Sequence, residues 1–295
     1  MINLIRTSCT LSTRALRRAG VHRRSLLLFV LTTLFLGSGC EMQVDHAPKD
    51  FPKPATQVVE PVDEVAQPLT EFMDRRSVTY GDGRMVDFLV IKIDEKEFDW
   101  GMANNPNDPK TVLAWRQELN ANLVINGSYF DENMQPTGYY HAAGATSTRF
   151  DWPGRDEQTN ETGYTGLVRI IDGDLKLSYL PAGRQRESAP DVAAFLSFPT
   201  LLYDGEALIE TDSKKYAHRT LLAQDVRGSS YIILTESGIP SLYETAVWLE
   251  AQPEEFAIAI NLDGGNSTGL SYADDEVKVE VISAAVPNVI YLNHQ

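Results

Sequence analysis

Short apolar runs separated by turn residues make up most of the chain after residue 76. Apolar runs bounded by glycine, proline or acidic residues are typical of strands. They predict strands at 86–93, 98–102, 122–126, 167–171, 175–180, 192–198, 201–203, 231–234, 256–262 and 277–282. The sequence AspGlyAsp at 172–174 is a hairpin signal between two of these strands.

Two segments between the strands have helical signals. Residues 241–251 form the clearer one, and in the other Asp108 would be the N-cap and Pro109 the first residue of a helix that runs through Glu118. A strand-rich chain with two helices predicts an α+β fold, in which helices pack against a mixed β-sheet.

The first 40 residues are predicted to be a secretory signal peptide. Six arginines and no acid precede an apolar stretch at 25–36 that is too short to span a bilayer as a mature helix. Of the two cysteines, Cys9 lies in this leader and Cys40 ends it, so no internal disulfide is expected. Cys40 resembles the lipidated cysteine of bacterial lipoproteins, although Gly37 stands where those proteins usually carry Leu. We expect lipidation at Cys40 and an exported, membrane-anchored protein of the bacterial cell envelope; the alternative is ordinary cleavage and release into the periplasm.

Residues 41–76 contain five prolines and are predicted to be a disordered linker. One domain at 77–295 follows, long enough for a full core. Removing the leader takes away six of the 26 basic residues and none of the 41 acidic ones, which leaves a net charge of about −21 with His neutral. Because duplex binding depends on basic patches, this charge argues against nucleic acid as a partner.

The most informative segment is residues 256–269, where an apolar run ends at an acid, two glycines and small polar side chains. Loops at strand ends are common places for sites. Gly264 and Gly265 allow positive φ and a close approach to a ligand. Polar groups could then converge in one small space, those of Asp263, Asn266, Ser267 and Thr268. The alternative is an ordinary hairpin turn, because AspGly is a common hairpin signal.

Other candidates are spread along the chain. Arg219 could bind phosphate or carboxylate through its planar guanidinium, or form a surface ion pair. His218 beside it could titrate near neutrality or have a structural role. Asn126 ends a predicted strand and could be a plain turn residue, while Tyr129 and Phe130 could stack on a sugar or belong to the core.

Glu244 has two interpretations. The sequence SerLeuTyrGlu at 241–244 matches a capping box, in which Ser241 and Glu244 each bond the backbone amide of the other. Alternatively, an acid at a helix start points into a cleft beside Asp263 and provides the second carboxylate that glycoside chemistry uses. Spacing alone favours the cap.

In chain order these segments resemble the phosphodiester glycosidase domain family, from residue 86 to the end. The family's AsnGlyGlyTyrPhe-like motif is matched by residues 126–130, and a strand ending in AsnLeuAspGlyGlyGlySerSer by residues 261–268. Small polar residues replace the family's choice at three positions, Ser128, Asn266 and Thr268. The remaining matches are an ArgThr pair, a helical Glu followed by an Ala, and a late ProAsn, at Arg219 and Thr220, Glu244 and Ala246, and Pro287 and Asn288.

Two segments depart from the family pattern. Relatives usually carry a SerGlyPro-like turn where this chain has Ser197, Phe198 and Pro199. Residues 139–165 are a polar and aromatic insertion that we expect to reshape the substrate entrance.

The resemblance implies a hydrolase that cleaves the glycosidic bond between a sugar and a phosphodiester, with a carbohydrate or glycan phosphodiester as substrate. Arg219 would hold the phosphate, Asp263 or Glu244 would act as base or stabilise the oxocarbenium-like centre, and Asn126 and Asn261 would orient sugar hydroxyls. The other implied substrate-binding residues lie on the same segments: Gly127, Ser128, Tyr129, Phe130, His218, Thr220, Gly264, Gly265, Asn266 and Ser267. Converging carboxylates could also hold Ca²⁺ or Mg²⁺, with ligands that the sequence does not identify.

Two other classes of protein stay open. Residues 265–269 spell GxSxG after a strand, the pattern of a serine hydrolase with Ser267 as nucleophile, although that turn must lead into a helix and a strand is predicted here. A glycan-binding lipoprotein without turnover would need Asn126, Tyr129 and Arg219 but no tuned carboxylate.

Overall fold

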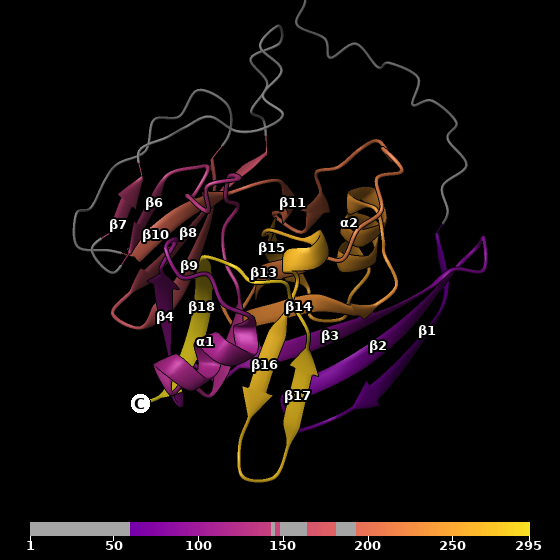
Figure 1. The fold of residues 1–295 in the computed structure, drawn as a ribbon. Helices are drawn as coiled ribbons and strands as arrows, with labels where there is room; N and C mark the ends of the chain where they lie inside the picture. Colours follow the sequence, from indigo (N-terminus) through magenta and orange to yellow (C-terminus); the bar gives the residue numbers. More distant parts are fainter. Residues whose placement is uncertain (1–59, 143–144, 148–163, 181–192) are drawn as a thin grey trace, which may run out of the picture. The chain divides into compact units, whose positions relative to one another are not determined.

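The computed structural model describes residues 60–142, 145–147, 164–180 and 193–295, all within one compact unit, Ala55–Gln295 (Figure 1). These residues form 18 strands and two α-helices, and all strand pairs among them are antiparallel. The predicted signal peptide with Cys40, and most of the insertion at 139–165, lie outside the described residues.

The largest sheet has eight strands in the order β1-β2-β3-β14-β13-β15-β11-β12. Leu221 pairs with Asn261, so the start of β13 lies beside the end of β15 and the ArgThr pair lies next to Asp263. The members of the sheet are β1 (Pro61–Pro68), β2 (Met73–Tyr80), β3 (Met85–Ile93), β11 (Thr200–Tyr203), β12 (Glu206–Ala207), β13 (Thr220–Asp225), β14 (Ser230–Ser237) and β15 (Phe256–Asn261).

Two five-stranded sheets complete the fold. One has the order β7-β6-β10-β8-β9 and the other β17-β16-β5-β18-β4. In the second of these, Asn126 at the end of β5 lies opposite Val289 near the start of β18. The strands are β4 (Phe98–Asn104), β5 (Leu123–Asn126), β6 (Tyr140–Ala142), β7 (Ala145–Ser147), β8 (Thr165–Ile171), β9 (Asp174–Leu180), β10 (Ala193–Ser197), β16 (Leu270–Ala273), β17 (Lys278–Val281) and β18 (Asn288–His294).

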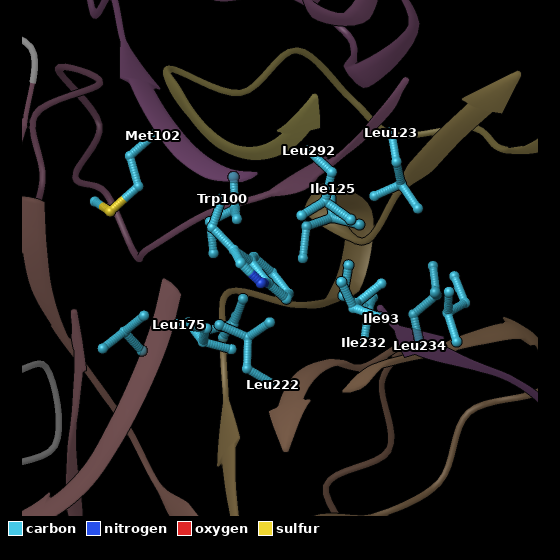
Figure 2. Packing of buried hydrophobic residues seen from close by; sticks show 14 of the residues in the cluster. Ile93, Trp100, Met102, Leu123, Ile125, Leu175, Leu222, Ile232, Leu234 and Leu292 are labelled. Carbon is cyan, nitrogen blue, oxygen red and sulfur yellow. The ribbon is translucent and has the colours of Figure 1, made fainter. Parts of the chain in front are cut away.

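The main core lies where one face of each sheet meets the others. Figure 2 shows side chains of this cluster from all three sheets, among them Leu222, Leu175 and Ile125. Successive residues of a strand point to opposite faces, so β3 sends Leu89 and Ile91 into this cluster and its alternate residues into a second one. The central strands are therefore buried on both faces, which explains their continuous apolar runs.

The two helices cover outer faces of the sheets. α1 (Val112–Leu119) buries Trp115 against Val124 of β5, and α2 (Leu242–Glu250) stacks Trp248 on Phe88 of β3 with ring centroids 4.0 Å apart. Figure 1 shows α1 beside β16 and β18 and α2 near β11. Neither helix is long and apolar enough to cross a membrane; this holds for the described residues.

The predicted α+β class with a mixed sheet is only partly right. Strands dominate, the sheets are antiparallel, and helices are a small part of the described chain. The reason is that strands consecutive in the sequence pair antiparallel in seven hairpins of the described chain, among them the predicted hairpin at 172–174 between β8 and β9. Parallel strands would need long crossover connections instead.

Two boundary predictions are also wrong. The linker predicted at 41–76 includes β1 and part of β2, because Pro61 and Pro68 stand at the two ends of an edge strand, where a missing N–H is tolerated. The first helix begins after Thr111 rather than Asp108, since the Thr111 hydroxyl accepts the Ala114 amide and Lys110 still bridges to Val286.

Candidate functional site

Asn126 joins two turns that are far apart in the sequence. Its Nδ2 donates to the Asp263 carbonyl at 2.7 Å, and its Oδ1 accepts from the Thr220 hydroxyl at 2.7 Å and from the Gly269 amide at 3.1 Å. The side chain is fully buried. The turns at Asn126 and Asp263 therefore meet, although they are 137 residues apart in the sequence. The side-chain polar atoms of Asn126 and Thr220 thus form hydrogen bonds within this frame of joined turns instead of binding a sugar.

A second set of bonds brings in the turn at 197–199. The Tyr129 hydroxyl donates to the Phe198 carbonyl at 2.8 Å and accepts from Asn261 Nδ2 at 2.7 Å. The Ser197 hydroxyl donates to the Asn261 carbonyl at 2.6 Å. The turn that departs from the family pattern thus forms one wall of the same cluster. Asn261 Oδ1 is buried and has no hydrogen-bond partner among the described residues.

The turn at 126–130 is held by Asn288 at the start of β18. Asn288 Oδ1 accepts from the Ser128 amide at 2.6 Å, and its Nδ2 donates to the Ser128 carbonyl at 3.3 Å. A Cβ on Gly127 would lie 2.2 Å from Asn288 Oδ1, which explains the glycine there. Phe130 packs against the α1 cluster and bridges to Pro136, so its described contacts are structural.

The turn at 263–269 is a short 3-10 segment, Gly265–Ser267, that runs directly into β16. Gly265 has φ +61°, and its amide donates to the His218 carbonyl at 2.8 Å. A Cβ on Gly264 would lie 2.6 Å from that same carbonyl. His218 therefore shapes this turn through its backbone, while its ring lies near the Thr235 hydroxyl. Because no helix follows, Ser267 lacks the strand-to-helix context of a serine hydrolase nucleophile.

Asp263 is a partly buried acid with an altered proton affinity. Burial raises the pKa of its carboxyl, while hydrogen bonds from the Ser267 side chain and the Gly264 amide, the latter at 2.9 Å, oppose the rise. A carboxyl with a raised pKa binds protons more tightly than a surface aspartate does. Asp263 can therefore accept a proton from a reacting group more readily.

Arg219 is a buried cation with a free donor. Its Nε and Nη2 donate to the Pro240 carbonyl at 3.3 Å, and Nη2 also donates to the Lys215 carbonyl at 2.8 Å. Nη1 makes no hydrogen bond with a described residue and is not fully buried. No carboxylate of the described chain forms an ion pair with this guanidinium. Burial lowers the pKa of Arg219, and the charges of Tyr129 and Glu244 oppose that effect.

The Tyr129 hydroxyl is close enough to the acid and to the cation to be affected by both charges. Burial raises the pKa of its hydroxyl, the negative charge of Asp263 raises it further, and the positive charge of Arg219 lowers it. Both charged groups therefore act on one phenol. The site combines an acid of raised pKa, a buried guanidinium and an aromatic ring in a rigid frame.

Glu244 forms the predicted capping box. Its Oε2 accepts from the Ser241 amide at 2.9 Å, and the Ser241 hydroxyl accepts from the Glu244 amide at 3.2 Å. Both carboxylate oxygens also accept hydrogen bonds from the guanidinium of Arg84, at the end of the β2–β3 turn. Arg84 could not be predicted from local patterns, because it lies 160 residues from its partner and outside every motif.

Metal ligation has no clear place among these residues. Within the described ranges, no three His, Cys, Asp or Glu side chains are grouped so that they could hold an ion.

Asn266, whose carbonyl accepts from the Ala284 amide at 2.7 Å, is exposed at the tip of its turn.

The model of the phosphodiester glycosidase family matches residues 119–293, which include all the site residues from Asn126 to Asn288. The zebrafish N-acetylglucosamine-1-phosphodiester alpha-N-acetylglucosaminidase catalytic domain, auto-inhibited by its pro-peptide, is 17% identical with a TM-score of 0.54 over 79% of this chain and 88% of that chain. A hypothetical protein from Synechocystis is 15% identical with a TM-score of 0.48, over 79% and 64% of the two chains. A search of curated proteins found no match.

Proposed function

Because the chain belongs to the phosphodiester glycosidase family, we propose that it hydrolyses the bond between the anomeric carbon of a sugar and a phosphodiester. The observation that supports this most directly is that the charges of an acid, Asp263, and of a cation, Arg219, both act on the Tyr129 hydroxyl. Asp263 has a raised pKa, and Arg219 offers a donor that no carboxylate of the described chain occupies. In such a substrate, the acid would act at the sugar carbon and the free guanidinium would bind the phosphate.

Arg219 would bind the phosphate. A guanidinium makes charge-assisted hydrogen bonds to phosphate oxygens, and such bonds are stronger when the cation is partly desolvated. Three bonds to the Pro240 and Lys215 carbonyls fix the orientation of this side chain, so only Nη1 is left for a ligand. A fixed cation loses little side-chain entropy when the phosphate arrives.

Asp263 would act as the base. When the bond from the anomeric carbon to oxygen breaks, its electron pair goes to the phosphate oxygen, and a phosphomonoester anion leaves without needing an acid. A water then bonds to the anomeric carbon and gives a proton to Asp263. A raised pKa suits this step, since a stronger base takes the proton more readily.

The substrate in this proposal is a carbohydrate or glycan phosphodiester of the cell envelope. The apolar leader and Cys40 suggest an exported protein with a lipid anchor. A net charge of about −21 after removal of the leader disfavours nucleic acid.

One observation favours a second candidate, a glycan-binding protein without turnover. Both oxygens of Glu244 are occupied, so the second carboxylate of a two-acid mechanism is missing at that position. Saturable binding of a sugar phosphodiester with no product would support this candidate.

The test is an assay with N-acetylglucosamine-1-phosphate methyl diester and, as a matched compound, methyl N-acetylglucosaminide without phosphate. The wild type should release free sugar from the diester only. Arg219→Gln should lose most of this activity, on the order of 100-fold in kcat/KM, because it removes a charge that binds the phosphate. Equal hydrolysis of both compounds, or full activity in folded Arg219→Gln, would contradict the proposal.

A further inference from the structure

Arg84 connects the β2–β3 turn to the start of α2. Its guanidinium pairs with both oxygens of Glu244, and its Nε donates to Asp82 at 2.7 Å. The rings of Tyr80 and Tyr216 flank it, with centroids 5.3 Å and 4.6 Å from the guanidinium carbon. Four partners from three segments therefore fix the position of this cation.

The pair is strongly asymmetric in exposure. The Glu244 side chain is 1% exposed and the Arg84 side chain is 30% exposed. In the described chain, Arg84 supplies the one cation within ion-pair distance of this buried carboxylate. Burying a carboxylate without a cation costs free energy. The charge of Glu244 is therefore compensated by Arg84 rather than by solvent.

One peptide unit separates this pair from the candidate phosphate-binding arginine. The Pro240 carbonyl accepts from Arg219 at 3.3 Å, and the Ser241 amide of the same peptide unit donates to Glu244 at 2.9 Å. The bonded groups follow one another in the order Arg84, Glu244, the peptide unit between Pro240 and Ser241, and Arg219. Glu244 is thus the carboxylate closest in this chain of bonds to the free donor of Arg219, and Arg84 engages it from the other side.

We propose that Arg84 is a positioning residue: by engaging Glu244, it leaves Arg219 available to the phosphate of the substrate. The inference rests on the proposed function, because it concerns the same phosphate. It assigns a role to a residue that precedes the family-matched segment at 119–293.

Two physical effects support this role. Without Arg84, no cation of the described chain lies within ion-pair distance of the Glu244 carboxylate, so the local potential at Arg219 becomes more negative and repels phosphate. The carboxylate can also turn toward Arg219 and occupy Nη1, the donor that phosphate would use. Both effects weaken phosphate binding, and both disappear if Glu244 is neutral.

The test is calorimetric titration with inorganic phosphate, with Arg219→Gln as the reference for a lost site. Arg84→Met should weaken phosphate binding on the order of tenfold. The double variant Arg84→Met with Glu244→Gln should return to wild-type affinity, because Gln still forms a capping box but carries no charge. Arg84→Lys, which keeps the cation, should lie between the wild type and Arg84→Met.

A matched control separates this effect from general loss of stability. Arg76 also pairs with a carboxylate beside α2, that of Glu254, but at the opposite end of the helix. Arg76→Met should lower the unfolding temperature and leave phosphate affinity unchanged. Unchanged affinity in folded Arg84→Met, an affinity that stays weak in the double variant, or wild-type protein without Arg219-dependent phosphate binding would each overturn the inference. Wild-type protein that binds phosphate in this Arg84-dependent way but hydrolyses no diester would overturn only the proposed function.

Discussion

Asp263 and Glu244 are the two acids considered for the candidate site, but their surroundings differ. Glu244 lies at the start of a helix, is 2% exposed and has hydrogen-bond donors on both oxygens. Asp263 lies on a glycine-containing turn, is only partly buried and has a pKa raised by that burial. A fixed, neutralised carboxylate supports its neighbours, whereas a partly desolvated one can exchange a proton.

The difference shows why the position of an acid near a site is not enough to assign chemistry to it. The family resemblance allowed either acid as base, and their hydrogen-bond partners separate them. Variants that change one acid at a time can test this difference between Asp263 and Glu244.

The largest effect is expected for the acids themselves. Asp263→Asn should lower kcat for sugar phosphodiester hydrolysis by about 10²–10⁴, the usual contribution of a general base. Glu244→Gln should change it less than about tenfold, because the cap is retained and the charge is not used in the reaction. Both variants would be assayed by release of free sugar, with folding checked by circular dichroism. The reverse order of effects would make Glu244 the base.

The next effect concerns the frame that holds Asp263 in place. Asn126→Ala leaves the Thr220 hydroxyl, the Gly269 amide and the Asp263 carbonyl without their buried partner. We expect a loss of about 2–4 kcal/mol in the free energy of unfolding, measured by urea denaturation. The matched control is Asn133→Ala at an exposed turn position, which should stay within about 0.5 kcal/mol of the wild type. Equal stability of the two variants would show that Asn126 does not join the turns in solution.

These residues also mark how far the sequence predicts the structure. Local signals sufficed for the strand at 256–262, the hairpin at 172–174 and the capping box of Glu244. The strand at Thr220–Asp225 was missed because its first residues looked like a site motif, and an edge strand was missed because of its prolines. Local signals act over a few residues, so they cannot predict which strands become neighbours.

The candidate site was only partly predictable, because local signals do not show which distant segments come together. The motif order indicated that Asn126 and Asp263 belong together, and their hydrogen bond bears this out. The third turn, at Ser197, and the partner of Glu244, Arg84, depend on long-range packing that spacing does not encode. Asn126 was predicted to orient a sugar hydroxyl and Thr220 to bind substrate, but both side chains are buried and bonded to each other in the frame.

A smaller effect is expected from the cap that fixes Glu244. Ser241→Ala removes the hydroxyl that accepts the Glu244 amide. Loss of an N-cap costs about 1 kcal/mol, which should appear as a lower urea midpoint with an unchanged slope. Because Arg84 still holds the carboxylate, phosphate affinity should change little. A loss of affinity as large as that in Arg84→Met would mean that the cap, rather than the ion pair, positions Glu244.

The smallest effect is a pH dependence of stability that follows from the raised pKa of Asp263. Its pKa is raised in the folded state, so the fold favours the protonated acid, and the stability from this group is greatest below the ordinary aspartate pKa. That stability is lost as pH rises through the folded-state value and stays lost at neutral pH. Asp263→Asn has no such charge, so its melting temperature relative to the wild type should be higher at pH 7 than at pH 4.

The control for this measurement is Asp275→Asn, which removes an exposed acid from the turn before β17. Its melting temperature relative to the wild type should vary less between the two pH values, because an exposed carboxyl keeps its solvation on folding. If Asp263→Asn and Asp275→Asn gave the same pH dependence, Asp263 would be titrating like a surface acid. The distinction between a fixed and an exchangeable carboxylate would then have to be sought in Glu244 and its bond to Arg84 instead.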